Sequence, residues 1–277
     1  MSSPTDSQAL TPEAIRAVLR TKTFGRTLHI LQEAPSTNTA ALALAQKGAE
    51  DGTVVVAERQ TAGRGRLGRS WYSPVRENLY CSVIVRQTPA PNRLTEWLSW
   101  VPLLSAVAAA RAVQIVTGLS PSLKWPNDII IGQRKLGGVL CETNGSRTQG
   151  RFVVVGIGIN VNTPRDAFPD EIRQLATSLA AEAAHPFDRA ALLAALLSEL
   201  EIRFEGLIAE QFADVKREYT KLCSTLGRHV RISLASGESV EGQADSINPD
   251  GSLRIIRNGA NAGTILDLRA GDVTYLR

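Results

Sequence analysis

The twelve residues Gln60–Trp71, QTAGRGRLGRSW, contain three glycines, three arginines and a tryptophan. They separate two apolar runs, 53–58 and 79–85, that we expect to be strands. Glycine lets a backbone approach a ligand closely, and guanidinium groups present paired donors that suit carboxylate and phosphate oxygens. The stretch therefore predicts an anion-binding loop carried by a sheet. A solvated arginine loop is the alternative.

Apolar periodicity on both sides of this loop predicts a mixture of helices and strands. The fold class is therefore α+β, with a sheet that carries the loops. The expected helices cover residues 11–20, 38–47, 93–116 and 189–219, the last as one or two helices, and the further strands cover 28–31, 123–125, 129–131, 136–142 and 151–161.

The pattern changes near Leu222. From His229 onward, short β-rich runs alternate with turn signals such as Ala235–Gly237 and Asn248–Gly251. This spacing is typical of a small barrel of about five strands. We expect two domains, 1–221 and 222–277.

The composition is that of an ordinary soluble protein of 277 residues, with 43% hydrophobic and 21% charged residues. A net charge of +4 is too small to indicate a nucleic-acid or membrane surface by itself. The three cysteines are widely spaced, which favours neither a disulfide framework nor a zinc site and indicates a reducing cytoplasm. We find no signal peptide and no run of about 20 uncharged apolar residues.

Three further motifs carry polar groups with more than one interpretation. Ser36-Thr37-Asn38 is best explained, from the residues alone, as a helix cap. Lys124-Trp-Pro-Asn-Asp128 brings a lysine, an amide and a carboxylate to a strand end, which suits phosphate and metal. Arg134-Lys-Leu-Gly-Gly138 places a cation before two glycines, where either a ligand lies against the backbone or a hairpin turns with a solvated lysine.

The remaining candidates give weaker signals. Gly156-Ile-Gly-Ile-Asn-Val-Asn162 ends a predicted strand on amides that are able to read a base edge. Cys141 lies in an alternating strand, and no motif ties it to a histidine, so packing is favoured over a nucleophile. Trp97 and Trp100 fall on one side of the long predicted helix and are expected in the core.

Taken in order, STN, QxxGRGRxGRxW, NLY, KWPND, RKxGG and GIGINVN resemble the biotin–protein ligases, also called biotin–[acetyl-CoA-carboxylase] ligases. The resemblance spans Ser36–Asn162 and implies a mixed-sheet biotin/lipoate ligase-like catalytic domain followed by an SH3-like β-barrel. Some members of the family carry an N-terminal winged helix-turn-helix of about 60 residues. About 35 residues precede STN here, which resembles the monofunctional type without that DNA-binding domain.

The resemblance implies a reaction in two steps. The biotin carboxylate attacks the α-phosphate of ATP to give biotinyl-5′-AMP, and a lysine of a biotin carboxyl carrier protein then attacks this anhydride. ATP, Mg²⁺ and biotin are implied as ligands, with the carrier domain of acetyl-CoA carboxylase or a related carboxylase as protein partner. We expect a cytoplasmic enzyme that binds neither DNA nor membrane and that associates weakly as a homodimer.

Within the same fold, a lipoate–protein ligase or octanoyltransferase is the alternative, and QTAGRGR and KWPND argue against it. A non-enzymatic basic module that binds nucleic acid through the arginine loop is the alternative from another class. Biotin-dependent ATP–pyrophosphate exchange separates all three.

By family position, each motif residue receives an expected role. The catalytic residues are Lys135, Arg66, Asp128 and Lys124, and Asp128 also faces Mg²⁺. Biotin is expected to contact Ser36, Thr37, Asn38, Gln60, Gly63, Arg64, Gly65, Arg66, Lys135, Gly137 and Gly138. ATP is expected to contact Arg66, Arg69, Trp71, Lys124, Asn127, Lys135 and Asn160.

The glycine-rich loop is also expected to move. Three glycines give residues 63–70 a large conformational entropy, and three arginines repel one another until an anion arrives. We therefore expect the loop to become ordered over biotin or biotinyl-AMP, because the closed form otherwise lacks counter-charge.

Overall fold

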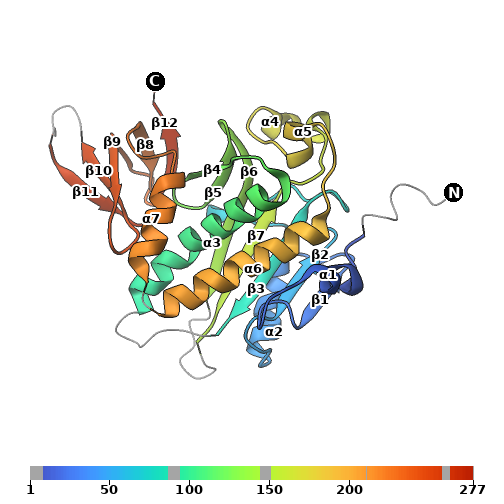
Figure 1. Ribbon diagram of the computed structural model, residues 1–277. Helices are drawn as coiled ribbons and strands as arrows, with labels where there is room; N and C mark the ends of the chain where they lie inside the picture. Colours follow the sequence, from blue (N-terminus) through green and yellow to red (C-terminus); the bar gives the residue numbers. More distant parts are fainter. Residues whose placement is uncertain (1–8, 87–93, 144–150, 210, 258–262, 277) are drawn as a thin grey trace.

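The computed structural model describes residues 9–86, 94–143, 151–209, 211–257 and 263–276, and they form two sheets with helices (Figure 1). The larger sheet has seven strands in the order β1-β2-β3-β7-β6-β5-β4. β1 and β2 are parallel, and the other neighbours are antiparallel. The predicted α+β class with a mixed sheet is confirmed. The strands are β1 (Leu28–Leu31), β2 (Val54–Ala57), β3 (Leu79–Val85), β4 (Ser122–Lys124), β5 (Asp128–Ile131), β6 (Arg134–Thr143) and β7 (Val153–Ile159).

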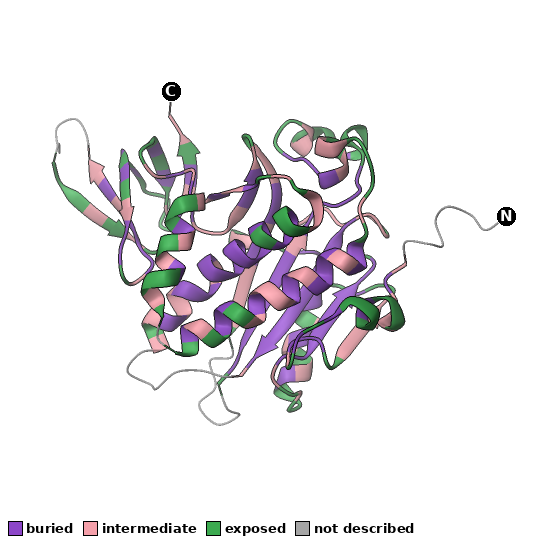
Figure 2. Cartoon of the chain, in the orientation of Figure 1, coloured by how far each residue is buried: buried purple, intermediate pink, exposed green. Residues whose placement is uncertain are grey.

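The centre of the sheet is buried on both faces. All residues of β3 are buried, and all but one in β7, so these strands are continuous apolar runs rather than alternating ones. Two long helices, α3 (Leu94–Thr117) and α6 (Arg189–Ile208), pack side by side on one face, while α2 (Thr37–Gln46) packs on the other (Figures 1 and 2). The centre of the sheet is therefore fully packed, and a site has to be formed by the loops and the strand ends.

Helix α3 is long and apolar enough to cross a membrane, by length and composition alone. In the structure 67% of its most apolar window is buried, and Trp97 and Trp100 are fully buried, as predicted for core residues. Packing between the sheet and α6 therefore accounts for the apolar character of the helix.

Four short helices complete the larger unit together with the long ones. α1 (Pro12–Val18) and α7 (Phe212–Leu222) fall where helices are predicted. α4 (Asp170–Arg173) and α5 (Leu179–Ala183) were not predicted, because four or five residues are too few to show a helical period. They lie beyond the ends of β6 and β7, at the top of Figure 1.

The C-terminal part forms a separate antiparallel sheet in the order β11-β10-β9-β8-β12. Alternating buried and exposed residues in β8 and β9 show that one face of this sheet is covered. The indole of Trp100 donates to the carbonyl of Pro249 at 2.7 Å, which attaches this sheet to α3. The strands are β8 (His229–Ser233), β9 (Ser239–Ile247), β10 (Leu253–Arg257), β11 (Ile265–Leu268) and β12 (Asp272–Tyr275).

A buried ion pair joins the helical layer to the sheet. Arg189, the first residue of α6, contacts the carboxylate of Glu58 at 2.6 Å, and both side chains are 1% exposed. Arg189 also donates to the carbonyl of Asn78, and Glu58 accepts the backbone N–H of Leu10. The pair thus ties α6, the ends of β2 and β3, and the N-terminal segment together.

Removing Glu58 should be costly, because the buried Arg189 guanidinium loses the carboxylate that it contacts directly. We expect Glu58→Ala to lower the free energy of unfolding by about 3–5 kcal/mol. Glu241→Ala, which breaks a half-exposed pair with Arg231, is the control and should cost less than about 1 kcal/mol. Urea unfolding followed by tryptophan fluorescence measures both, and equal small losses would contradict the proposed importance of the buried pair.

Candidate active site

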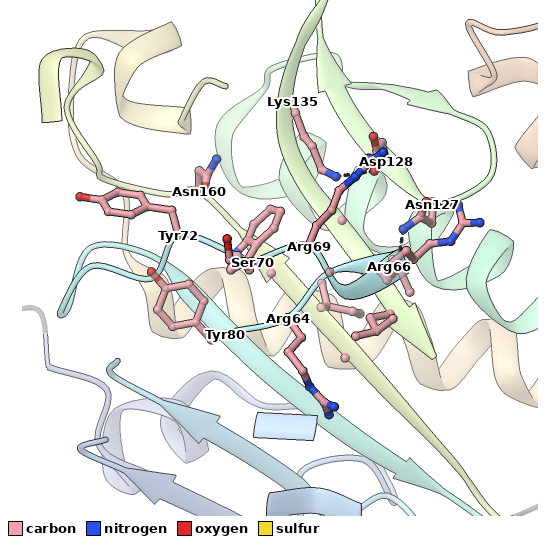
Figure 3. A pocket seen from close by; sticks show the side chains of 18 of the residues that line it. Arg64, Arg66, Arg69, Ser70, Tyr72, Tyr80, Asn127, Asp128, Lys135 and Asn160 are labelled. Atoms are coloured by element: carbon pink, nitrogen blue, oxygen red, sulfur yellow. Dashed lines mark hydrogen bonds and ion pairs between the residues drawn. The ribbon is translucent and has the colours of Figure 1, made fainter. Parts of the chain in front are cut away.

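A cavity of about 450 Å³ lies where the glycine–arginine loop, residues 60–71, crosses the ends of the sheet strands (Figure 3). Its lining combines the loop, the start of α2, β6, β7 and the segment that contains α4. All but three of the residues predicted for a site line this one cavity. They are Ser36, Thr37, Asn38, Gln60, Arg64, Gly65, Arg66, Arg69, Trp71, Asn127, Asp128, Lys135, Gly138 and Asn160.

The loop is folded as a narrow hairpin. The N–H of Trp71 donates to the carbonyl of Gly63 at 2.8 Å, and the N–H of Gly65 donates to that of Arg69 at 2.7 Å. A 3₁₀ turn, η2 (Arg66–Gly68), forms the tip, where Gly68 has a φ of 73°, a conformation that favours glycine. Gly68 therefore serves the turn at the tip of the loop.

The indole of Trp71 lies against the backbone of β7. A Cβ atom at Gly158 would approach within 2.8 Å of the indole ring, so only glycine leaves room for this contact. A second glycine of the same strand, Gly156, leaves room for Asn38, whose Oδ1 would lie 2.0 Å from a Cβ there. Gly156 and Gly158 of β7 thus leave room for one side chain from the loop and one from α2.

The three loop arginines already have partners within the protein. Arg64 contacts Glu142 at 3.2 Å, and Arg69 pairs with Asp272. Arg66 donates to the side-chain oxygen of Asn127 at 3.0 Å (Figure 3). The expectation that the closed loop lacks counter-charge is therefore wrong.

Arg66 is partly buried between the loop and the C-terminal sheet, which affects its pKa. Burial lowers the pKa of the Arg66 guanidinium, although Asp272 and Asp128 act in the opposite direction. Arg66 also donates to the carbonyl of Gly271, so the loop touches the C-terminal sheet at two neighbouring residues.

Lys135 projects into the cavity from an irregular part of β6. Ile129 pairs with Gly137 whereas Ile130 pairs with Lys135, so Leu136 is an extra residue in the strand. Such bulges redirect the neighbouring side chain. The Lys135 ammonium lies 2.6 Å from Asp128 Oδ1 and 5.5 Å from the centre of the Trp71 ring.

The start of α2 forms a polar part of the lining. Ser36 occupies the N-cap position and is buried, yet its side chain makes no capping hydrogen bond, contrary to the interpretation from the residues alone. The N–H of Thr37 donates to Gln60 Oε1 at 2.9 Å. Asn38 donates to the carbonyl of Leu140 and accepts from Ser82, which fixes it to the sheet.

An apolar part of the lining comes from residues that carry no sequence motif. It consists of Tyr72, Phe168, Ile172, Leu175 and Ala176. Asn160 connects this part to the sheet by donating to the carbonyl of Thr177 at 2.9 Å. Sequence reasoning missed the segment because its short helices and loops show no period.

Lys124, Gly63 and Gly137 do not line the cavity. The Lys124 ammonium lies 5.0 Å from the centre of the Tyr275 ring, and burial lowers its pKa. Gly63 packs under Trp71 and Ser73, and Gly137 packs against the carbonyl of Gly158. Asp272 of β12 lines the cavity although it was not predicted.

No group of three or more His, Cys, Asp or Glu side chains arranged to hold a metal occurs in the part of the chain that the structure describes. The carboxylates that line the cavity are Asp128 and Asp272. A metal ion bound here would therefore take most of its ligands from a bound substrate or water.

This fold and this cation-lined cavity agree with three comparisons. The model of the biotin/lipoate A/B protein ligase family matches residues 30–160. A biotin–[acetyl-CoA-carboxylase] ligase of Mycobacterium tuberculosis is 35% identical over 282 residues, which cover 99% of this chain and 100% of the relative. A bifunctional ligase/repressor BirA of Bacillus spizizenii is 35% identical over 88% of this chain and 74% of its own length.

Solved structures show the same likeness. A biotin protein ligase from Aquifex aeolicus in complex with biotin and ATP has a TM-score of 0.75 and 28% identity, covering 91% of this chain and 99% of that one. A Leishmania major biotin protein ligase in complex with biotinyl-5-AMP has a TM-score of 0.58 and 28% identity, covering 88% of this chain and 99% of that one. The chain belongs to the biotin/lipoate protein ligase family and, within it, to the biotin protein ligases.

Cys81 and Cys223 of this ligase are buried, and Cys141 is half-buried. Burial raises the pKa of the Cys81 thiol to about 12 and also raises the pKa values of Cys141 and Cys223. Because the thiolate is the reactive form, we expect a thiol reagent at pH 8 to label the folded protein at least about 10²-fold more slowly than the unfolded protein. Rapid labelling of Cys141 in the folded protein would instead restore it as a candidate nucleophile.

Proposed function

We propose that this chain joins biotin to one lysine of a biotin carboxyl carrier protein or domain, with ATP as the energy source and biotinyl-5′-AMP as the intermediate. The observation that carries the proposal is the position of the Lys135 ammonium, which enters a cavity with one polar and one apolar part. Biotin and ATP bind to related enzymes of the same fold.

Adenylation requires two anions to meet. A carboxylate oxygen of biotin attacks the α-phosphorus of ATP, the bond from that phosphorus to the bridging oxygen breaks, and pyrophosphate leaves. The reactants repel each other, so cations fixed around the α-phosphate lower the barrier by neutralising charge and by holding the atoms in line. Lys135, Arg66 and Arg69 line the cavity and supply that charge.

The second step needs an open path to the anhydride. The lysine amine of the carrier attacks the biotinyl carbonyl carbon, the bond to the AMP oxygen breaks, and the amine loses a proton. We propose that Asp128, which pairs with Lys135, orients that ammonium in both steps. Lys124 lies outside the lining and adds positive potential from behind Asp128.

The other residue assignments follow the two parts of the lining. We propose that the biotin side consists of Ser36, Thr37, Asn38, Gln60, the loop backbone at Arg64 and Gly65, and Gly138 of β6. Gly63 and Gly137, which do not line the cavity, are proposed to support this side through their packing. Trp71 and Asn160, together with the apolar residues from the α4 segment, are proposed to form the adenine side. A flat, apolar surface beside a ring suits a nucleobase.

The residues present fit a magnesium ion that arrives with ATP. Mg²⁺ is commonly held by one or two carboxylates together with substrate phosphates. Asp128 would contribute a carboxylate oxygen, with Asn127 beside it. The ion would neutralise phosphate charge when bound.

Further proposals concern the organisation of the molecule. We propose that residues 1–221 form the catalytic domain and that the sheet of residues 222–277 is an SH3-like barrel, which its five antiparallel strands support. We also propose that the enzyme is cytoplasmic, acts without DNA and associates weakly as a homodimer. The carrier of acetyl-CoA carboxylase is the proposed acceptor, in line with the name of a relative matched along its full length.

Exchange of labelled pyrophosphate into ATP tests the proposed function directly. We expect exchange that requires biotin and is not supported by lipoate or octanoate. Exchange with lipoate alone would identify a lipoate ligase, and salt-dependent nucleic-acid binding without exchange would indicate a binding module.

Lys135→Ala should leave the protein folded and slow adenylation by about 10²–10³-fold, since it removes a cation from the reacting centre. Single-turnover formation of biotinyl-AMP measures this. Lys47→Ala, at an exposed position beyond α2, is the control. Normal adenylation by Lys135→Ala would refute the assigned role.

Trp71→Ala should weaken the binding of ATP far more than the binding of biotin. Stacking of a base on an aromatic ring contributes roughly 1–3 kcal/mol, which corresponds to about 5–150-fold in affinity. Calorimetric titration with each ligand separates the two effects. Equal losses for ATP and biotin would show that the indole does not serve the nucleotide.

A further inference from the structure

The adenine-side wall of the cavity is attached to the backbone of Lys135 itself. The N–H of Lys135 donates to the carbonyl of Leu175 at 2.7 Å, and the N–H of Thr177 donates to the carbonyl of Lys135 at 2.9 Å. Lys135 and Ala176 thus form an isolated parallel bridge. We call residues 172–177 the wall segment.

The wall segment is held weakly at its start and more firmly at its end. α4 has four residues and is too short to be stable alone. Ile172, Leu175 and Ala176 line the cavity, and Leu175 is 65% exposed, whereas Ala176 and Thr177 are buried, so burial fixes only the end of the segment. Polar contacts add to this: Asn160 donates to the carbonyl of Thr177, and two backbone hydrogen bonds join the segment to Lys135.

One carboxylate joins both sides of this bridge. Glu182 of α5 accepts from Arg134 Nη2 at 2.7 Å with Oε1, and the same oxygen accepts from the hydroxyl of Thr177. Arg134 precedes Lys135 in β6, and Thr177 ends the wall segment. The side chains of Arg134 and Glu182 are 30% and 15% exposed, so the contact is partly shielded from water.

We propose that Arg134 and Glu182 are a positioning pair that clamps the wall segment onto Lys135 and thereby sets the affinity for the adenine part of ATP. The proposal rests on the proposed function and extends it to two residues that do not line the cavity. Neither residue touches the reacting atoms. Charge-assisted hydrogen bonds of this kind are stronger and more directional than neutral ones, which suits a clamp.

Glu182→Ala removes the acceptor from both Arg134 and Thr177. We expect the KM for ATP in biotin-dependent exchange to rise about tenfold, whereas the KM for biotin stays within about twofold. Thr177→Val, which leaves the ion pair in place, should change the KM for ATP in the same direction by a smaller factor. Asp170→Ala is the matched control, because it breaks an exposed ion pair within α4, between Asp170 and Arg173.

Two further measurements distinguish a clamp from general stabilisation. Arg134→Glu combined with Glu182→Arg reverses the pair and should bring the KM for ATP back to within about threefold of the wild type. Hydrogen exchange at the amides of Lys135 and Thr177 should be about tenfold faster in Glu182→Ala than in Asp170→Ala. Unchanged exchange at these amides, or equal changes in both KM values, would overturn the proposal.

The two proposals fail separately. A wild-type protein without biotin-dependent exchange would overturn the proposed function, while amide exchange needs no substrate and still decides whether the clamp exists. A wild-type protein with such exchange, whose Glu182→Ala variant keeps its KM for ATP, would overturn the positioning pair alone.

Discussion

Repulsion among like charges is the constraint on which this site depends. Lys135 and the loop arginines line one cavity, and each is held by a different partner. The carboxylates belong to Glu142 of β6, Asp128 of β5 and Asp272 of β12, and the amide belongs to Asn127 in the turn before β5. The larger sheet must therefore present its strand ends together, and the C-terminal sheet must lie beside them, before the cations can be concentrated in one place.

The site also depends on two glycines of β7 that leave room for side chains from other elements. Gly156 and Gly158 carry no side chains, and Asn38 and Trp71 occupy the room that this leaves. The glycine–arginine loop and the start of α2 thus rest directly on the backbone of β7. The site is built on a buried strand rather than on flexible loops alone, which gives its geometry the stiffness that in-line transfer needs.

The sequence was sufficient for the sheet, the long helices and about half of the cavity lining, because those features depend on apolar periodicity and on short sequence motifs. It was insufficient where the decisive contacts are between distant residues. Asp272 lies about 200 positions from Arg69, and no local pattern relates them. The wall segment was missed because its helices are too short, and Ser36 was interpreted as a cap because the absence of a capping bond is a property of the folded geometry.

The pairing of Arg69 with Asp272 has a thermodynamic consequence for turnover. In the proposed reaction, a phosphate that binds this guanidinium must first displace a carboxylate, so this contact contributes only the difference between two ion pairs to the free energy of binding. The same exchange runs in reverse when a product departs, because Asp272 is available to recapture the arginine. An internal competitor of this kind lowers anion affinity at both ends of the proposed catalytic cycle by up to about 1 kcal/mol, because the Arg69 side chain is 66% exposed.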